Sequence, residues 1–237
     1  MFIDKKIGRN YCRLSVERCV IICHGLPYEA GSVIQKGYYE LAKNFSSKVA
    51  SLIFDFSGTG LSEGNFNLLN WKEDLERISS EFEKVILLGY SIGGAIAISA
   101  ASELKNVEKL IVVSTPCCLE FFNEENLKAI YLNATSKSLL SGIGSYENFK
   151  EKFIKDFMEI EPLKWISVIS IPKLIVHGSR DQIVPLDHAE KLYSKARKPK
   201  TLLIAKDGDH FLRKREDVTG KIIDWLEGKF GEGIFFI

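Results

Sequence analysis

"LLGYSIGGA", residues 87 to 95, joins two apolar runs through a turn that is rich in glycine. Residues 84–89 predict a buried strand, and residues 92–104 predict a buried helix. A Gly-x-Ser-x-Gly sequence at a strand-to-helix turn is the context of a nucleophile elbow. Such a turn is sharp and strains the serine backbone, so Gly89 and Gly93 stand where side chains would collide. The sequence therefore favours Ser91 as a nucleophile over a glycine-rich turn in which the serine has no role.

Apolar segments of the same kind recur along the chain and alternate with segments of helical character. The strands are apolar throughout rather than alternating, which is typical of a parallel sheet covered on both faces. Their order predicts an α/β fold with a mostly parallel, doubly wound sheet, whose ligands bind at the carboxyl ends of the strands. The alternating segment 11–16 is a candidate antiparallel edge strand. The further strands are expected at 19–23, 50–56, 109–115, 173–179 and 201–207, and the further helices at 33–48, 70–82, 187–197 and 215–228.

The composition predicts one globular domain spanning residues 1–237. Hydrophobic residues make up 46% of the chain, charged residues 27%, and the formal net charge is +1. With no long basic block, neither nucleic acid nor an anionic membrane is an expected partner. No secretory signal and no run of about 20 apolar residues is present. The five cysteines lack zinc-like or CxxC spacing, which predicts reduced thiols and a cytoplasmic location, with Cys12, Cys19 and Cys23 in the core.

One segment, residues 117–170, is far longer than an ordinary crossover between two strands. It contains at least two helical stretches, which predicts a helical cap inserted into the single domain rather than a second domain. Phe149, Phe153 and Phe157 recur at every fourth position and share one helix face. We expect this face either to line the substrate pocket over Ser91 or only to attach the cap to the body.

A serine hydroxyl is a weak nucleophile and needs a general base. His210 follows the last predicted strand in a loop of small and acidic residues, and a strand-end loop can reach Ser91. His24 and His177 lie at earlier strand ends, and His188 is expected at the surface in the first turn of a helix. His210 is therefore the best candidate for the base.

The base needs a carboxylate that orients it. Asp181 follows a separate strand by a short loop and can approach the far nitrogen of the His210 ring. Asp207 and Asp209 share the loop of His210, where turn formation explains them. The predicted triad is therefore Ser91, Asp181 and His210, in this order along the chain.

The order of these motifs resembles that of the α/β-hydrolase family, in which nucleophile, acid and histidine follow one another along the chain. The resemblance covers residues 24–225 and rests on "HGLP", "DFSGTGLSEG", "GYSIGG", "HGSRDQIVP" and "GDH". Within the family the set looks most like small esterases of the cinnamoyl/feruloyl-esterase and monoacylglycerol-lipase type. The resemblance implies that the backbone N–H groups of Leu26 and Ile92 form the oxyanion hole, with the His24 side chain structural. Ser57 stands where the family more often has arginine, and Asp55 and Gly58 are expected to shape their loop.

The residues together predict a serine hydrolase that cleaves carboxylic esters through an acyl-enzyme intermediate. The same triad could act on a thioester, an amide or a carbon–carbon bond, because one fold hosts many chemistries. A catalytically silent, hydrolase-like binding protein is a further alternative. A nucleotide-binding domain is disfavoured, because no P-loop or GxGxxG follows the first strand. No metal and no organic cofactor is implied, the expected partner is a small ester substrate, and a homodimer is left open.

Overall fold

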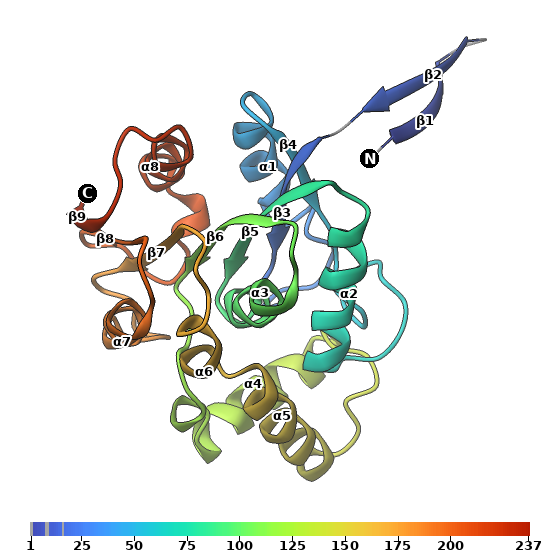
Figure 1. The fold of residues 1–237 in the computed structure, drawn as a ribbon. Helices are drawn as coiled ribbons and strands as arrows, with labels where there is room; N and C mark the ends of the chain where they lie inside the picture. The colour runs from blue at the N-terminus through green and yellow to red at the C-terminus, as the bar shows by residue number, and fades with distance from the viewer. Residues whose placement is uncertain (1, 8–9, 16) are drawn as a thin grey trace.

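The computed structural model describes the backbone of residues 2–7, 10–15 and 17–237, and the side chains from residue 17 onward. Its centre is a seven-stranded sheet in the order β4-β3-β5-β6-β7-β8-β9, and every pairing in this sheet is parallel (Figure 1). The strands are β3 (Arg18–Cys23), β4 (Ala50–Ile53), β5 (Lys84–Tyr90), β6 (Val107–Val113), β7 (Lys173–Gly178), β8 (Lys200–Ala205) and β9 (Gly233–Phe236). The sheet confirms the predicted α/β class.

Alternate residues of the strands point to opposite faces of the sheet, and each face has its own apolar core. On one face, Val20 and Ile22 of β3 pack with α1 (Tyr38–Ser46) and α8 (Glu216–Leu226). On the other, Cys19, Ile21 and Cys23 belong to the cluster that includes α2 (Leu68–Ser80), α3 (Ile92–Glu103) and α7 (Asp187–Lys195). The apolar strands are therefore explained by helices on both faces.

The strand order reverses beside β3. The chain passes from β3 to the edge strand β4 and then returns to the other side of β3 with β5, after which strands are added outward. Ligands of open α/β sheets bind at such a switch point, outside the carboxyl ends of the strands. In this chain those ends lead into His24-Gly25-Leu26 after β3 and Ser91 after β5.

The N-terminal prediction is corrected by the pairing. β2 (Asn10–Ser15) is antiparallel as expected, but it pairs with β1 (Phe2–Ile7) in a separate two-stranded sheet. It is therefore not an edge strand of the main sheet among the pairings that the structure describes. Residue 16, the end of the predicted segment, and the side chain of Cys12 lie outside the described residues.

The long segment between β6 and β7 contains η1 (Leu119–Phe121), α4 (Glu124–Ser136), α5 (Tyr146–Ile160) and α6 (Pro162–Ile166), which lie together below α2 and α3 in Figure 1. Phe66 N–H donates to the carbonyl of Ser141 at 2.8 Å. Asn67 Nδ2 donates to Asp156 Oδ2 at 2.8 Å, and burial raises the pKa of that carboxyl. The segment is thus tied to the residues just before α2. In the described part of the chain, no helix has the length and apolar character that crossing a membrane requires.

Candidate active site

Ser91 lies at the turn between β5 and α3. Its backbone has φ 51° and ψ −125°, a region that residues with side chains rarely adopt, so the turn holds the residue under strain. A Cβ added to Gly89 would lie 2.4 Å from the carbonyl oxygen of Gly93. A Cβ added to Gly93 would lie 2.3 Å from the carbonyl oxygen of His24. Both glycines are therefore required for α3 to begin this close to β3 and β5.

Gly25 brings the end of β3 against the same turn. A Cβ at this position would lie 2.9 Å from Ser91 Cβ and 3.1 Å from the Tyr90 carbonyl oxygen. The N–H groups of Leu26 and Ile92, on either side of this contact, donate to no acceptor in the part of the chain that the structure describes. Two free donors beside a serine could stabilise a negatively charged oxygen.

We expect Gly25→Ala to lower kcat/KM on any substrate of Ser91 by about 100-fold, because a displacement of about 1 Å at a reacting group can have that effect. The added methyl group must move either Ser91 or the β3 end. Steady-state kinetics on the purified variant test this. Gly220→Ala is the matched control, because a Cβ there would meet nothing within 4 Å, and it should keep the parent's activity. Parental kinetics for Gly25→Ala would show that the close contact is not needed.

His210 and Asp181 meet at the carboxyl ends of β7 and β8. His210 Nδ1 lies 2.8 Å from Asp181 Oδ2, and Asp181 Oδ1 accepts the N–H groups of Ile183 and Val184 at 2.9 and 2.8 Å. Burial would raise the pKa of the Asp181 carboxyl, but the His210 ring and the Val184 N–H outweigh it and hold the pKa below its ordinary value. The carboxylate is therefore charged and can fix the ring with Nδ1 protonated.

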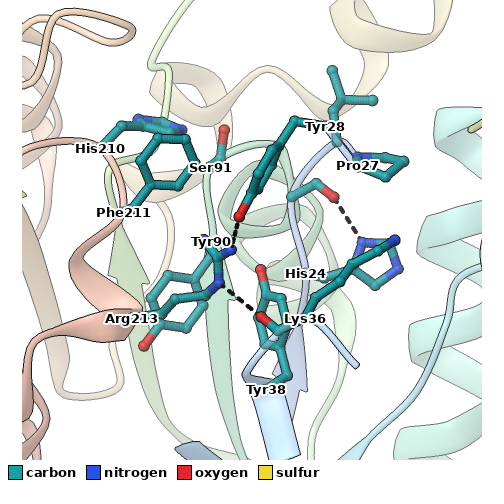
Figure 2. A pocket seen from close by; sticks show the side chains of 12 residues that line it. His24, Pro27, Tyr28, Lys36, Tyr38, Tyr90, Ser91, His210, Phe211 and Arg213 are labelled. Carbon is teal, nitrogen blue, oxygen red and sulfur yellow. Dashed lines mark hydrogen bonds between the residues drawn. The ribbon is translucent and has the colours of Figure 1, made fainter. Parts of the chain in front are cut away.

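The Ser91 hydroxyl and His210 lie beside the same cavity, where Figure 2 shows both. No hydrogen bond joins them within the described chain, so proton transfer requires a small closing movement, as is common in unliganded hydrolases. The structure thus places the three predicted residues after the carboxyl ends of β5, β7 and β8, with Ser91 and His210 beside one cavity and Asp181 against the His210 ring.

The acidic residues that share the His210 loop have other partners. Asp209 Oδ1 accepts the Phe211 N–H at 2.8 Å, which is a local turn contact. Asp207 Oδ1 pairs with Arg180 at 2.8 Å on the exposed side. Neither carboxylate contacts the His210 ring, whereas Asp181 does.

Two further histidines are held as neutral, structural groups. His24 Nδ1 lies 2.7 Å from the Gly25 carbonyl oxygen, and His24 Nε2 accepts the Phe56 N–H at 3.0 Å. The ring therefore joins the β3 end to the loop after β4, and burial lowers its pKa to about 4. His177 Nε2 donates to the Val184 carbonyl at 2.8 Å, and burial lowers the pKa of that ring too.

Loop-shaping roles also fit Asp55 and Gly58. The Asp55 carboxylate accepts the N–H groups of Val33 and Leu61 at 2.9 and 3.0 Å. Gly58 has φ +75°, and a Cβ there would lie 2.4 Å from the Phe66 nitrogen. The contacts of Asp55 and Gly58 therefore shape this loop more than the side chain at position 57 does.

The surface position expected for His188 is wrong. The residue is buried, Cys117 N–H donates to its Nδ1 at 3.0 Å, and the same nitrogen lies 3.0 Å from Cys117 Sγ. Cys117 Sγ and Cys118 Sγ are 3.3 Å apart, and the three residues have donor atoms within 4.8 Å of one another. Burial raises the pKa of both thiols and lowers that of the His188 ring, which favours the uncharged form of all three groups. The cluster attaches α7 to the start of the insertion. Helical position alone did not indicate this burial.

Two cavities meet at Ser91. The larger has a volume of about 380 Å³ and is mostly apolar; its walls from the insertion are Phe121, Phe122, Asn126, Ala129, Ile130, Asn133, Ala134 and Leu140. The smaller, drawn in Figure 2, has a volume of about 60 Å³ and is more polar; its walls beyond the shared residues include Lys36, Tyr38, Tyr90 and Arg213. Both are lined by Leu26, Pro27, Tyr28, Ser91, His210 and Phe211.

The three rings predicted for the pocket lie behind its wall. Phe149, Phe153 and Phe157 are buried, but none of them lines the larger cavity. The centroids of Phe153 and Phe157 lie 4.9 and 4.6 Å from that of Phe122, which does line it. The helical spacing identified a buried face, and that face packs α5 against its neighbours and does not line the larger cavity. Phe122 was missed because it directly follows the short segment η1 as the second residue of a Phe-Phe pair, and such a pair has no periodicity.

The sequence of residues 18–137 matches the model of a family described as "alpha/beta hydrolase fold", and residues 141–229 match one described as "PhoPQ-activated pathogenicity-related protein". Among curated proteins, the uncharacterized protein YfhR of Salmonella typhi is 30% identical over 166 residues, which are 67% of this chain and 53% of YfhR. The uncharacterized protein YqkD of Bacillus subtilis is 26% identical over 202 residues, which are 81% of this chain and 64% of YqkD. The chain thus spans about half the length of the YfhR relative that it matches.

Solved structures share the fold at low identity. A monoacylglycerol lipase from Paleococcus ferrophilus superposes with a TM-score of 0.69 at 19% identity, over 97% of this chain and 100% of the lipase. A mutant of the meta-cleavage product hydrolase CumD also has a TM-score of 0.69, at 18% identity, over 90% of this chain and 93% of CumD. These likenesses extend the shared fold to nearly the whole chain.

Proposed function

Because the chain belongs to the α/β-hydrolase fold family, we propose that it is a serine hydrolase that cleaves carboxylic esters through an acyl-enzyme intermediate. The observation that carries the proposal is that a strained Ser91 lines the same cavity as His210, whose ring Asp181 contacts at 2.8 Å. Strained backbone conformations of this kind cluster at functional sites. The pair and the serine come from different strand ends, so their meeting is a property of the fold.

In the proposed reaction, His210 Nε2 accepts the Ser91 proton as Oγ attacks the ester carbonyl carbon. Asp181 holds the Nδ1–H and stabilises the imidazolium that forms, since its carboxylate is charged and buried beside the ring. The Leu26 and Ile92 N–H groups donate to the oxyanion. His210 then protonates the leaving alkoxide and an acyl-Ser91 ester remains.

Deacylation repeats the same steps with water. His210 takes a proton from the water, which attacks the acyl-enzyme carbonyl; a second oxyanion forms and collapses, and Ser91 leaves with the proton from His210. The products are a carboxylic acid and an alcohol. Every proton is carried by His210, so no further group is required for the reaction to balance.

We also propose that residues 117–170 act as a cap within a single domain. The larger cavity is walled by η1 and α4 on one side and by the strand-end loops on the other. Its apolar walls suit an acyl chain or an aryl group, and its volume of about 380 Å³ exceeds what a short acetate needs.

An active-site probe and a substrate panel test the function together. A fluorophosphonate should label the protein at Ser91, identified by peptide mass spectrometry, and p-nitrophenyl esters should be hydrolysed. Thioester, anilide and carbon–carbon substrates assayed beside them decide the bond that is cleaved. Labelling with no turnover of any ester would assign the machinery to another bond, and absence of both would favour a silent binding protein.

We expect Phe122→Ala to shift the preference among p-nitrophenyl esters toward longer acyl chains, because removing the ring enlarges the cavity at its wall. kcat/KM over a series from acetate to laurate measures the shift.

Phe149→Ala is the matched control. Its ring packs against Phe66 and Tyr131 away from the larger cavity, with centroids 6.1 and 5.6 Å apart. Both variants should lose stability, by about 3–5 kcal/mol for a buried phenylalanine, so chemical denaturation is measured for each. Only Phe122→Ala should change the chain-length profile; the same change in both, or none in either, would remove Phe122 from the pocket wall.

A further inference from the structure

We propose that the smaller cavity beside Ser91 is a carboxylate subsite, in which Arg213 binds an anionic group that the ester substrate carries on one side of its scissile bond. The inference rests on the proposed function and names the class of ester: one with an apolar group at one end and a carboxylate near the other. Its basis is the position and the unused hydrogen-bonding capacity of Arg213.

Arg213 lies in η2 (Leu212–Lys214), three residues after His210, and its side chain lines the smaller cavity together with Ser91 and His210. Figure 2 shows its guanidinium between the Tyr28 hydroxyl and the Lys36 carbonyl. Arg213 Nη2 donates to Tyr28 Oη at 2.6 Å, and Nε lies 3.4 Å from the Lys36 oxygen. The cation therefore faces the space into which a group attached to the reacting carbonyl would extend.

Most of the guanidinium donors remain available. An arginine side chain has five N–H donors, and these two contacts use two of them. Within residues 17–237, no carboxylate lies within ion-pair distance of Arg213. Its remaining neighbours are aromatic: the rings of Tyr28, Tyr38 and Phe211 lie 5.4, 5.2 and 5.4 Å from its central carbon. The rings fix the orientation of the planar fork without neutralising its charge, which prepares it for a bidentate contact with a carboxylate.

Lys36 adds a second positive charge to the same cavity. Burial lowers the pKa of Lys36; Asp55 and Glu29 oppose this shift, and Arg213 adds to it. Asp55 is already committed to the backbone N–H groups of Val33 and Leu61, and it does not line the cavity. Among the residues that the structure describes, no acidic side chain lines the smaller cavity, so an entering anion meets the two basic side chains Lys36 and Arg213.

The two cavities differ in polarity, as the apolar end and the carboxylate end of such a substrate do. They share the residues around Ser91 and then separate, the larger toward the apolar walls of η1 and α4 and the smaller toward Arg213. At about 60 Å³ against about 380 Å³, the smaller cavity suits a compact group such as a carboxylate better than a long chain. A long neutral chain would therefore enter only the larger cavity.

Arg213 could instead act only as a clamp between the loop at Tyr28 and Lys36 and the segment after His210. A clamp would affect charged and neutral substrates equally, so the decisive readout is a ratio. Two substrate pairs separate the possible positions of the anion. In the first pair, mono-p-nitrophenyl glutarate has a carboxylate on the acyl side, and p-nitrophenyl glutaramate has a neutral amide at the same position. In the second pair, the butyrate ester of 3-hydroxypropanoate has the carboxylate on the alcohol side, and the butyrate ester of 3-hydroxypropanamide has the neutral amide there.

For the wild-type protein we expect kcat/KM for the carboxylate to exceed that for its neutral amide by at least about tenfold in one pair, as a charge-assisted bidentate contact would give. Arg213→Met should bring that ratio to one or below, and Arg213→Lys should retain only part of it, because the fork is lost. Lys214→Met, at the exposed next residue, should keep both rates. If Arg213→Met does not fold, the wild-type ratio and Arg213→Lys still decide.

Ratios near one in both wild-type pairs would overturn the subsite, as would an equal loss on charged and neutral esters in Arg213→Met. If the esters that carry the neutral amide group are still hydrolysed in that case, the proposed esterase function remains supported. If no ester in either pair is cleaved and the fluorophosphonate does not label Ser91, the function itself fails.

Discussion

Replacing Ser91 by alanine is expected to reduce ester hydrolysis by at least about 10⁴-fold while the protein stays folded. The hydroxyl is the attacking group in the proposed mechanism, and Ser91 is the only described serine, threonine or cysteine that lines either cavity. Only the binding contacts and the oxyanion donors would remain. Initial rates at high enzyme concentration measure the residual activity, and circular dichroism with thermal unfolding checks the fold.

Ser114 provides a control that shares the positive φ of Ser91. It also has a positive φ, of 50°, it is buried at the end of the neighbouring strand β6, and it lines neither cavity. Ser114→Ala should therefore keep the parent's turnover within about threefold, since surroundings rather than strain decide a serine's reactivity. Near-parental turnover in Ser91→Ala would refute the mechanism.

The second large effect is expected at Asp181. Asp181→Asn should lower kcat by about 10⁴-fold, because an amide group facing Nδ1 favours the wrong tautomer of His210 and does not stabilise the imidazolium. His210→Ala should have an effect of similar size. Asp209→Asn, whose parent carboxylate accepts only the Phe211 N–H, should change kcat by less than about tenfold.

Single-turnover kinetics with a p-nitrophenyl ester resolve the acylation step in each variant. A loss at Asp209 larger than that at Asp181 would reassign the orienting acid to the His210 loop. Equal, small losses at both would mean that the 2.8 Å contact between Asp181 and His210 does not contribute to acylation.

The central strands could be predicted because their signal is local. β3, β5, β6, β7 and β8 each contain an apolar run, and each begins and ends within two residues of its prediction. β4 is shorter, at Ala50–Ile53, since Phe56 N–H donates to His24 instead of to a neighbouring strand. α1 begins at Tyr38 rather than at 33 because Gly37 has φ 81° just before it. The end of β4 thus depends on a tertiary contact, and the start of α1 depends on one backbone angle.

β9 was missed for a different reason. Gly233–Phe236 is short, follows a glycine-rich turn and alternates between half-buried and exposed residues. Residues 233–236 form a strand because they pair in parallel with β8. Nothing in these four residues alone predicts a parallel edge strand. Short edge strands take their structure from the sheet that they join.

The candidate triad was accessible from sequence because each member directly follows an apolar strand, and carboxyl ends of parallel strands lie at one edge. The surroundings were not accessible in this way. Phe122 directly follows the short segment η1 and Arg213 lies in η2, and neither position has a periodicity that predicts its surroundings. The burial of His188 depends on a contact with Cys117, 71 residues away in sequence. Local pattern identifies the reacting groups, whereas the shape of the space around them is set by contacts between distant segments.

The neutral imidazole that joins the β3 end to the loop before α2 makes this fold sensitive to acid. The pKa of His24 is about 4 in the folded chain, against about 6.5 for an exposed histidine, so the unfolded chain binds a proton that the folded chain does not. The folding free energy that this ring contributes is fully present above about pH 6.5 and is lost as the pH falls toward about 4, on the order of 3 kcal/mol in all. Since the same ring contacts Gly25, which touches Ser91, acidification should weaken the position of the oxyanion donors together with the fold.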